Sequence, residues 1–363
     1  MIMNKMLALC MSPDQGGLEL YFLKFARYYN NDNLFVACTR NSYITKNIIQ
    51  NKLECNPRGF INNILNFLKL RKYIVDKDID IIHVSWSKDL FLAILLKVFS
   101  KKYLKIVFYR QMKISRPKRD LYHKFVYSNI DVFLVITKKL YYEACDYLPI
   151  HKSKIHVLEY GINIPSKDSL VDKEKFYSDN NLDNSIFLIG VFSRIEEQKG
   201  QHLVLNAISQ SEHEIQLCII GHSMDNSYKQ RLQDDALRLN IQHHVHFIDF
   251  VDSPMSYMPC FDLIILPTYE ETFGLIVAEA MMMEVPVIGS NAGGVPEIIN
   301  HQENGLLFES KNYKDLQKRI DFIIEKKEST RQLVNKASQF ANERYDYDKH
   351  FVKFEELMMG SEK

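Results

Sequence analysis

The chain has 363 residues, of which 46% are hydrophobic, 12% aromatic and 25% charged. This length favours two domains, and the composition excludes a disordered chain or a fibrous repeat. The net charge of +1 conceals an asymmetry, because residues 1–165 contain 26 Lys and Arg against 13 Asp and Glu, whereas residues 166–363 contain 20 against 32. This asymmetry suggests that the basic half meets an anionic partner, although a solvated basic face explains it too.

The six cysteines form no Cys-x-x-Cys pair, so the sequence indicates neither a zinc knuckle nor a disulfide framework and fits a reducing cytoplasm. The N-terminus lacks the long apolar core and the cleavage site of a signal peptide. The most apolar stretch, residues 90–99, is about half the length needed to span a bilayer. No transmembrane helix is expected.

Short β-branched or aromatic runs alternate with segments of helical period along most of the chain, which is typical of βαβ units. In the first half the pattern predicts strands at 3–10, 34–38, 79–84, 104–109, 132–136 and 154–158, and helices near 17–29, 58–75, 88–99, 117–128 and 138–148. After a polar stretch over 165–184, the alternation restarts with strands near 186–192, 215–220, 244–248, 262–266, 285–288 and 306–308. From residue 311 onward the pattern is helical only.

We therefore expect two doubly wound α/β domains, each with a parallel sheet. Residues 1–165 form the first and residues 166–340 the second, while 341–363 form a C-terminal helix that packs back towards the first domain. Ligands of such sheets bind beyond the carboxyl ends of the strands, so the loops that follow strands are the places to look for a site.

After the first strand, SPDQGGLE places Gly16 and Gly17 at the start of a helix, where free amides could approach a phosphate. Taken alone, these glycines fit a tight turn that serves packing equally well. The motif is not Gly-x-Gly-x-x-Gly, which weakens a dinucleotide interpretation.

In the second half, GVFSRIEEQKG places Arg194 and Lys199 between a buried strand and the next helix. Two cations there could grip a diphosphate without a bound metal, Arg through its fork and Lys as a point charge. Solvated surface cations are the alternative.

The segment EETFGLIVAEA places Glu271 in a loop after a strand and begins a helix at Phe273, Gly274 and Leu275. The amides of Gly274 and Leu275 suit a phosphate, because a helix N-terminus carries partial positive charge. Glu279, further along the helix, could accept hydrogen bonds from a ribose diol, and Glu271 from a second sugar. The alternative is that Glu279 is an ordinary exposed helix acid and Glu271 a first-turn charge favoured by the helix dipole.

With these motifs the sequence resembles the retaining glycosyltransferases of family 4, also called glycosyl transferases group 1. EETFGLIVAEA resembles the family's Glu-x7-Glu signature, and GVFSRIEEQKG resembles its Gly-Arg-Leu-x3-Lys-Gly phosphate loop. SNAGGVPEII and SPDQGGLE match further family motifs in order and spacing. The resemblance implies a GT-B fold, in which two Rossmann-like domains face a central cleft.

By this resemblance, Arg194 and Lys199 would bind the donor diphosphate, Glu279 the ribose, and Glu271 the transferred sugar. Glu271, Arg194 and Lys199 would be the catalytic residues. Backbone around the donor would come from Gly16, Gly17, Phe273, Gly274 and Leu275. The reaction would transfer a sugar from a nucleotide-diphosphate donor to a hydroxyl with retention at the anomeric carbon, and the diphosphate would be the leaving group. No cofactor is implied beyond the nucleotide sugar itself.

The chain departs from the family where many relatives carry a histidine, since it has Arg110 and Gln111 in VFYRQMKIS. These two residues and Glu19 are the candidates for contacts with the acceptor or the donor sugar. No metal site is expected: the aspartates of DKDID (76–80) precede a strand, and the histidines at 243–246 supply too few ligands.

Residues 97–124 hold ten basic residues against one acidic residue, Asp120. Contact with the inner membrane surface and a plain solvated surface both explain this segment, and nucleic acid is not an expected partner. The sequence thus predicts a cytoplasmic glycosyltransferase, with or without peripheral membrane contact, that acts on a glycan or lipid-linked glycan in cell-surface polysaccharide synthesis. The alternatives are a nucleotide-sugar epimerase on the same fold and a non-catalytic basic binding module.

Overall fold

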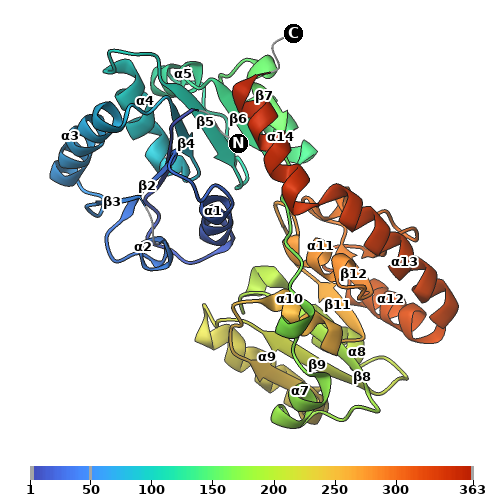
Figure 1. The fold of residues 1–363 in the computed structure, drawn as a ribbon. Helices are drawn as coiled ribbons and strands as arrows, with labels where there is room; N and C mark the ends of the chain where they lie inside the picture. Colours follow the sequence, from blue (N-terminus) through green and yellow to red (C-terminus); the bar gives the residue numbers. More distant parts are fainter. Residues whose placement is uncertain (1–3, 49–50, 361–363) are drawn as a thin grey trace. The chain divides into compact units, whose positions relative to one another are not determined.

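The computed structural model describes residues 4–48 and 51–360, and its chain forms two compact units. The first unit comprises the residues up to Glu159 together with those from His350 onward, and the second comprises Tyr160–Lys349 (Figure 1). The chain therefore passes from one unit to the other twice. The boundaries expected from the sequence were after residues 165 and 340.

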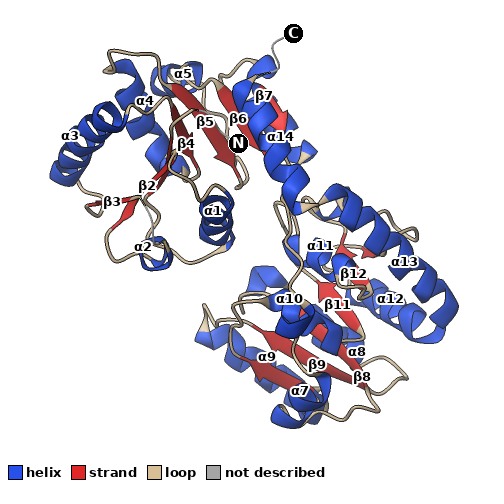
Figure 2. Ribbon diagram, in the orientation of Figure 1, coloured by secondary structure: helices blue, strands red, loops and turns tan. Residues whose placement is uncertain are grey.

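The first unit is built on a seven-stranded parallel sheet with the strand order β3-β2-β1-β4-β5-β6-β7 (Figure 2). β1 pairs with two strands, so that Met6 lies opposite Leu34 on one side and Ile81 on the other. The order reverses between β1 and β4, which makes this the topological switch point of the sheet. The strands are β1 (Met6–Cys10), β2 (Leu34–Thr39), β3 (Lys52–Cys55), β4 (Ile81–Val84), β5 (Lys105–Arg110), β6 (Val132–Val135) and β7 (Ile155–Val157).

Helices cover both faces of this sheet. Because crossover connections are right-handed, the helices that lead from β1 to β3 lie on one face and those that lead from β3 to β7 on the other. They are α1 (Gly17–Tyr28), α2 (Tyr43–Asn47), α3 (Phe60–Lys77), α4 (Leu90–Val98), α5 (Leu121–Ser128) and α6 (Lys138–Tyr147).

The strands predicted for this half are confirmed, although residue 3 of the first lies outside the described residues. β3 and α2 were not predicted. The helix expected over 117–128 begins only at Leu121, because the Asp120 carboxylate caps it by accepting a hydrogen bond of 3.0 Å from the His123 amide.

The C-terminal segment is not one helix over 341–363. α13 (Lys327–Arg344) ends first, and α14 (Tyr347–Met359) begins after a break. α14 lies against α1: Phe351 stacks on Tyr28 at 4.1 Å between ring centroids, and Phe354 contacts Phe25 edge-on at 5.3 Å. The last three residues, 361–363, lie outside the described part.

The second unit has a six-stranded parallel sheet with the order β10-β9-β8-β11-β12-β13, which reverses between β8 and β11. Its strands confirm the predicted positions: β8 (Phe187–Phe192), β9 (Ile215–Ile220), β10 (Val245–Ile248), β11 (Leu263–Leu266), β12 (Val287–Ser290) and β13 (Leu306–Phe308). The remaining helices are α7 (Lys173–Asp179), α8 (Gln201–Ile208), α9 (Asn226–Arg238), α10 (Pro254–Tyr257), α11 (Leu275–Met282) and α12 (Tyr313–Glu325).

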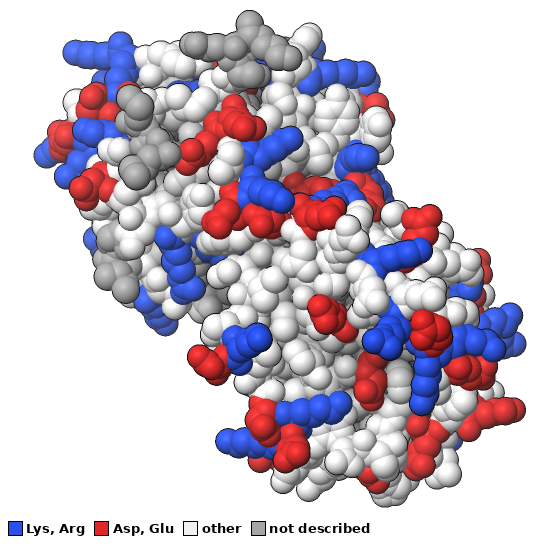
Figure 3. All heavy atoms as spheres, turned by 45° about the vertical axis from the view of Figure 1, so that its right-hand side comes forward, with Lys and Arg blue, Asp and Glu red and all other residues white. Residues whose placement is uncertain are grey.

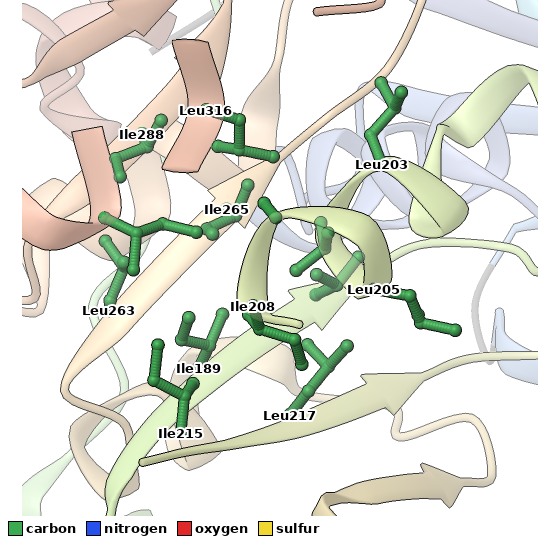
Figure 4. Packing of buried hydrophobic residues seen from close by; sticks show 14 of the residues in the cluster. Ile189, Leu203, Leu205, Ile208, Ile215, Leu217, Leu263, Ile265, Ile288 and Leu316 are labelled. Atoms are coloured by element: carbon green, nitrogen blue, oxygen red, sulfur yellow. The ribbon is translucent and has the colours of Figure 1, made fainter. Parts of the chain in front are cut away.

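The core of this unit lies between its sheet and the helices α8 and α12. Strand residues such as Ile189, Leu217 and Ile265 pack against Ile208 of α8 and Leu316 of α12 (Figure 4). Because helices cover both faces of these strands, their residues are apolar throughout, and the sequence pattern therefore predicted the strands.

The polar stretch over 165–184 is not a linker. It contains α7, whose Phe176 and Tyr177 are buried. The Phe176 ring packs edge-on against Phe261 at 5.4 Å, and the Tyr177 hydroxyl donates to the Cys260 carbonyl at 3.2 Å. The two aromatic side chains fix this helix to the second unit despite its polar surroundings. Within the described residues, no helix is both long and apolar enough to cross a membrane.

Candidate functional site

The candidate residues of the second unit lie in the loops at the carboxyl ends of β8 and β11 and on α11, the helix that follows β11. β8 and β11 are neighbours on either side of the switch point, so the loops that follow them diverge and leave room for a ligand. The β8 loop carries Arg194 and Lys199, and the β11 loop carries Glu271 and Phe273.

Lys199 and Glu271 form an ion pair, although 72 positions separate them in the sequence. The Lys199 Nζ lies 2.9 Å from the Glu271 Oε2, and the two side chains keep 18% and 25% of their surface exposed. The other carboxylate oxygen of Glu271 accepts the Thr272 amide at 3.2 Å. The residue predicted to bind phosphate and the residue predicted to bind the sugar are therefore adjacent.

Close backbone packing fixes the position of both residues. Gly200, directly after Lys199, has a left-handed φ of 71°, and a Cβ on it would overlap the Pro267 carbonyl oxygen. Gly293 has a φ of 64°, and a Cβ there would overlap the Glu271 carbonyl oxygen. That carbonyl accepts the Gly294 amide at 2.8 Å. The glycines of SNAGGVPEII therefore hold the β12 loop directly against the loop that carries Glu271.

α11 begins immediately after this loop. Gly274 precedes it in the left-handed region, and no side chain caps the helix. The first amides of a helix have no partner within it, so binding of an anion there remains a prediction. Glu279 lies on α11 with a buried side chain, unlike the exposed helix acid of the alternative interpretation.

Phe273 has a structural role that the sequence did not reveal. Its buried ring packs edge-on against Tyr160 at 5.1 Å and Tyr345 at 5.6 Å. Burial and, secondly, the charge of Glu271 raise the pKa of Tyr160 well above its usual value. The ring thus anchors the loop, while the backbone of Phe273 stays beside the α11 N-terminus.

Arg194 is not brought into the Lys199–Glu271 pair. Its guanidinium bonds Glu196, with Nη2 at 3.0 Å from Oε1, and its side chain is 58% exposed. The buried Gln201 holds the Arg194 backbone by donating to its carbonyl at 2.8 Å and to the Ser193 hydroxyl at 2.9 Å. Because the Arg194 guanidinium is exposed and pairs with a single carboxylate, it can turn from Glu196 towards a diphosphate.

A second connection between the β8 and β11 sides was missed from the sequence. His202 on α8 lies between two tyrosines, with Nε2 2.7 Å from the Tyr269 hydroxyl and Nδ1 2.9 Å from the Tyr228 hydroxyl. Burial lowers the pKa of His202. In addition, the Tyr269 amide donates to the Gln198 carbonyl at 2.9 Å. The sequence does not reveal this contact, because the two tyrosines lie 26 and 67 positions away from the histidine.

In the first unit, α1 begins at Gly17 directly after the extended Gly16. A Cβ on Gly17 would meet no atom within 4 Å, whereas one on Gly16 would contact the Glu19 carboxylate at 3.4 Å. Glu19 itself is buried in the first turn of α1. Internal packing therefore does not demand a glycine at position 17.

The two residues in place of the family histidine behave differently. The Arg110 guanidinium closes its own loop by donating to the Met112 carbonyl at 2.6 Å and the Lys113 carbonyl at 2.7 Å. Burial lowers its pKa. Gln111 is buried at the carboxyl end of β5. The contacts of Arg110 and Gln111 with a sugar remain predictions.

A buried carboxylate at the switch point of the first unit was also missed. Asp89 follows β4, accepts the Met11 amide at 2.7 Å, and lies 3.7 Å from the Arg58 guanidinium. Burial raises the pKa of Asp89 to about 7, even though the Met11 amide and Arg58 favour the charged form. Arg58 also lies over the Trp86 ring, 5.2 Å from its centroid. Among the described residues, no group of three or more His, Cys, Asp or Glu is arranged to hold a metal ion.

The family model described as glycosyl transferases group 1 matches residues 172–340, and the model described as glycosyltransferase family 4 matches residues 15–165. An uncharacterized glycosyltransferase of Methanocaldococcus jannaschii is 28% identical over 59% of this chain and 56% of its own length.

Two bacterial relatives carry more specific names. The O-antigen biosynthesis glycosyltransferase WclY of Escherichia coli is 28% identical over 77% of this chain and 79% of its own length. The capsular polysaccharide biosynthesis glycosyltransferase CapM of Staphylococcus aureus is 30% identical over 48% and 47%. The chain thus matches about half the length of two of these three relatives.

The fold is shared with HepE of Anabaena, which has been solved with UDP. The TM-score is 0.86 at 20% identity, over 98% of this chain and 99% of that one. HepE has also been solved with UDP-glucose, with a TM-score of 0.83 to this chain. The two matching family models, over residues 15–165 and 172–340, together span most of the sequence, and the chain belongs to the group 1, family 4 glycosyltransferases.

Proposed function

We propose that this chain is a retaining glycosyltransferase that moves a sugar from a nucleoside-diphosphate donor to a hydroxyl of a glycan or lipid-linked glycan. The observation that carries the proposal is the Lys199–Glu271 pair beside the uncapped N-terminus of α11. A cation, a carboxylate and free helix amides then lie in one group of loops. These groups match a phosphate and the hydroxyls of the attached sugar.

In the proposed reaction the bond between the anomeric carbon and the diphosphate oxygen breaks, and the acceptor oxygen bonds to that carbon on the same face. The electron pair stays with the diphosphate, and the proton of the acceptor hydroxyl passes to a diphosphate oxygen. Lys199, Arg194 and the amides of α11 would stabilise the charge that develops on the leaving group. Retention rests on the resemblance of the segment from Glu271 to Glu279 to the family signature.

The other predicted contacts fit the same arrangement. Glu279 would accept hydrogen bonds from the ribose, and Glu271 from the transferred sugar, while Phe273, Gly274 and Leu275 supply backbone amides. We further propose that Gly17, together with Gly16, lets a diphosphate approach α1, because nothing inside the protein occupies the space beside Gly17.

Two cations at a diphosphate can take the part that a divalent metal takes in other transferases, and we propose a reaction without a metal. The names of WclY and CapM support a role in cell-surface polysaccharide synthesis, and the complexes of HepE favour a UDP-sugar donor. Six free cysteines are compatible with the cytoplasm, where we place the reaction.

Thermal unfolding with UDP, GDP, ADP, CDP and dTDP, in the presence of either EDTA or Mg²⁺, tests the donor site. One nucleotide, UDP in the first instance, should raise the melting temperature equally in both conditions, because a ligand of the folded state stabilises it. Lys199→Met should remove that rise. If none of the nucleotides stabilises the protein, the donor site is refuted, and a rise that needs Mg²⁺ refutes metal independence.

Product analysis with the matching nucleotide sugar distinguishes the reaction class. A transferase releases free nucleoside diphosphate in proportion to added acceptor. Conversion of the nucleotide sugar into its epimer without acceptor would contradict the proposal and establish an epimerase.

A further inference from the structure

α3 carries apolar side chains on the face that points away from the sheet. Its buried stripe runs through Asn66, Leu70 and Ile74, four residues apart. At 100° per residue, the opposite side of the helix holds exposed apolar residues, namely Ile61, Ile64, Leu65, Leu68 and Val75. Ile61 is 70% exposed and Val75 72%. An amphipathic surface helix has the reverse arrangement.

The first half of α3 shows this reversed arrangement of polar and apolar side chains most clearly. The buried Asn66 faces the protein, where its amide oxygen accepts the Asn56 amide and its amide nitrogen donates to the Asn56 carbonyl, both at 2.9 Å. Phe60 at the helix start is 85% exposed. Folding of this unit therefore does not account for the outward apolar residues, and such a surface signals an interaction.

Two neighbouring helices continue this surface. α4 packs against both α3 and α5 (Figure 1). The Phe91 ring of α4 contacts Tyr122 of α5 at 5.3 Å, and both rings are exposed, together with Phe125. Leu121, at the start of α5, is 83% exposed. We call the exposed apolar side chains of α3, α4 and α5 the apolar helix face.

Cations border this face without neutralising partners. A groove of about 330 Å³ lies between α3 and α4, with walls that include Leu68, Val75 and Phe99 and a border that includes Arg71, Lys72 and Lys101. One acid, Asp76, also lines it. Among the described residues, none of these three cations forms an ion pair with an acidic side chain. The face of the molecule drawn in Figure 3, by comparison, intersperses Lys and Arg with Asp and Glu.

The basic segment 97–124 contributes less than its composition suggests. Lys97 is neutralised by Asp131 at 2.6 Å, and Lys102 by Asp78 at 2.6 Å and Asp80 at 3.0 Å. The surface that combines unpaired cations with apolar groups is centred on α3, and segment 97–124 adds Phe99, Lys101, Leu121 and Tyr122 to it.

We propose that the apolar helix face docks on an anionic lipid bilayer, with α3 and α5 lying in the headgroup region. Apolar side chains flanked by Lys and Arg are what an interfacial helix presents to anionic lipid. A second copy of the chain is the less favourable occupant, because a two-fold contact would bring the same cations together. The proposal does not depend on the proposed function, since it concerns lipid binding alone.

Flotation of the full-length protein with vesicles tests this directly. The protein should float with vesicles of equal parts phosphatidylcholine and phosphatidylglycerol, and not with phosphatidylcholine alone. The double variant Ile64→Glu, Leu68→Glu should bind at least tenfold more weakly. The matched control is Leu237→Glu on α9, which is 64% exposed in the second unit and should leave binding unchanged. Combined Arg71→Gln, Lys72→Gln and Lys101→Gln should reduce both the binding and its salt dependence.

A gain-of-signal measurement guards against a folding defect in these variants. With brominated lipid in the anionic vesicles, and with Trp86→Phe in both variants to remove the native fluorophore, the fluorescence of Leu68→Trp should be quenched, whereas that of Leu237→Trp should not. Failure of the unchanged protein to float with anionic vesicles at low salt overturns the proposal, as does equal loss of binding in the double variant and the Leu237→Glu control. A dimer that the double variant dissociates, with no vesicle binding, would assign the face to a second copy.

Discussion

Replacing Glu271 with glutamine should strengthen the binding of a nucleoside diphosphate and at the same time slow sugar transfer. The Lys199 Nζ lies 2.9 Å from the Glu271 carboxylate, so an incoming diphosphate must compete with that carboxylate for the cation. Glutamine keeps the shape of the side chain and one hydrogen-bond acceptor, but it removes the competing charge. The rate of sugar transfer should fall because the Glu271 carboxylate is the proposed partner of the sugar hydroxyls.

The size of the effect follows from the geometry of the pair. At 2.9 Å, and with an effective dielectric constant of about 20, the Coulomb attraction is about 6 kcal/mol. Desolvation and side-chain ordering offset most of it, since both side chains still reach solvent. A net coupling of about 1 kcal/mol remains, at the upper end for exposed pairs. Releasing Lys199 should therefore tighten the binding of UDP about fivefold.

Isothermal titration of UDP at low ionic strength measures this, with Glu271→Gln, Lys199→Met and the double variant. Lys199→Met should weaken binding, and Glu271→Gln should have no further effect once the lysine is gone. The control is Glu214→Gln. It removes the same charge directly before β9, at the amino ends of the strands, whereas the candidate site lies at their carboxyl ends. Weaker UDP binding in Glu271→Gln, or the same gain in Glu214→Gln, would refute the competition.

Three further predictions follow from other features. The raised pKa of Asp89, about 7, means that the folded state holds this proton more tightly than the unfolded state, so its contribution is complete below about pH 4 and is lost as the pH rises to 7. Asp89→Asn should therefore raise the free energy of unfolding at pH 8, by up to about 4 kcal/mol, with no gain at pH 4 in denaturant titrations. His202→Phe removes two hydrogen bonds and should lower the free energy of unfolding by about 2 kcal/mol. It should also lower kcat more than it changes KM, and an unchanged kcat would show that His202 does not position the loops. Gly293→Ala should displace Glu271 and abolish donor binding, whereas Gly17→Ala should leave the melting temperature unchanged and weaken only nucleotide binding.

The sheets were largely predictable because their strands are buried on both faces and read as continuous apolar runs. The strand that was missed, β3 (Lys52–Cys55), is at the sheet edge and has an exposed lysine and a half-buried glutamate. Such a strand looks like a loop, because edge strands carry charges. α7 was missed for a similar reason, since only Phe176 and Tyr177 distinguish it from a linker.

The site was predictable residue by residue but not in its connections. The motifs identified Lys199 and Glu271 separately, yet no spacing rule joins two residues 72 positions apart. Asp89 was not singled out, because burial, which perturbs its carboxyl group, is a property of the folded unit and not of the neighbouring sequence.

The return of the chain end to the first unit has a consequence for biosynthesis. The aromatic side of α1 is covered by Phe351 and Phe354, and the His350 Nδ1 lies 2.6 Å from the Glu159 carbonyl oxygen. These residues leave the ribosome only after the whole of the second unit. At 5–20 residues per second, the stretch from Tyr160 to Lys349 takes roughly 10 to 40 s to synthesise.

During that interval the first unit lacks Phe354 and Phe351, the residues of α14 that pack on Phe25 and Tyr28. The unit that is translated first is therefore completed last. A chain that stops before residue 350 would contain all residues of the second unit but would lack the side chains of α14 that pack on α1 of the first.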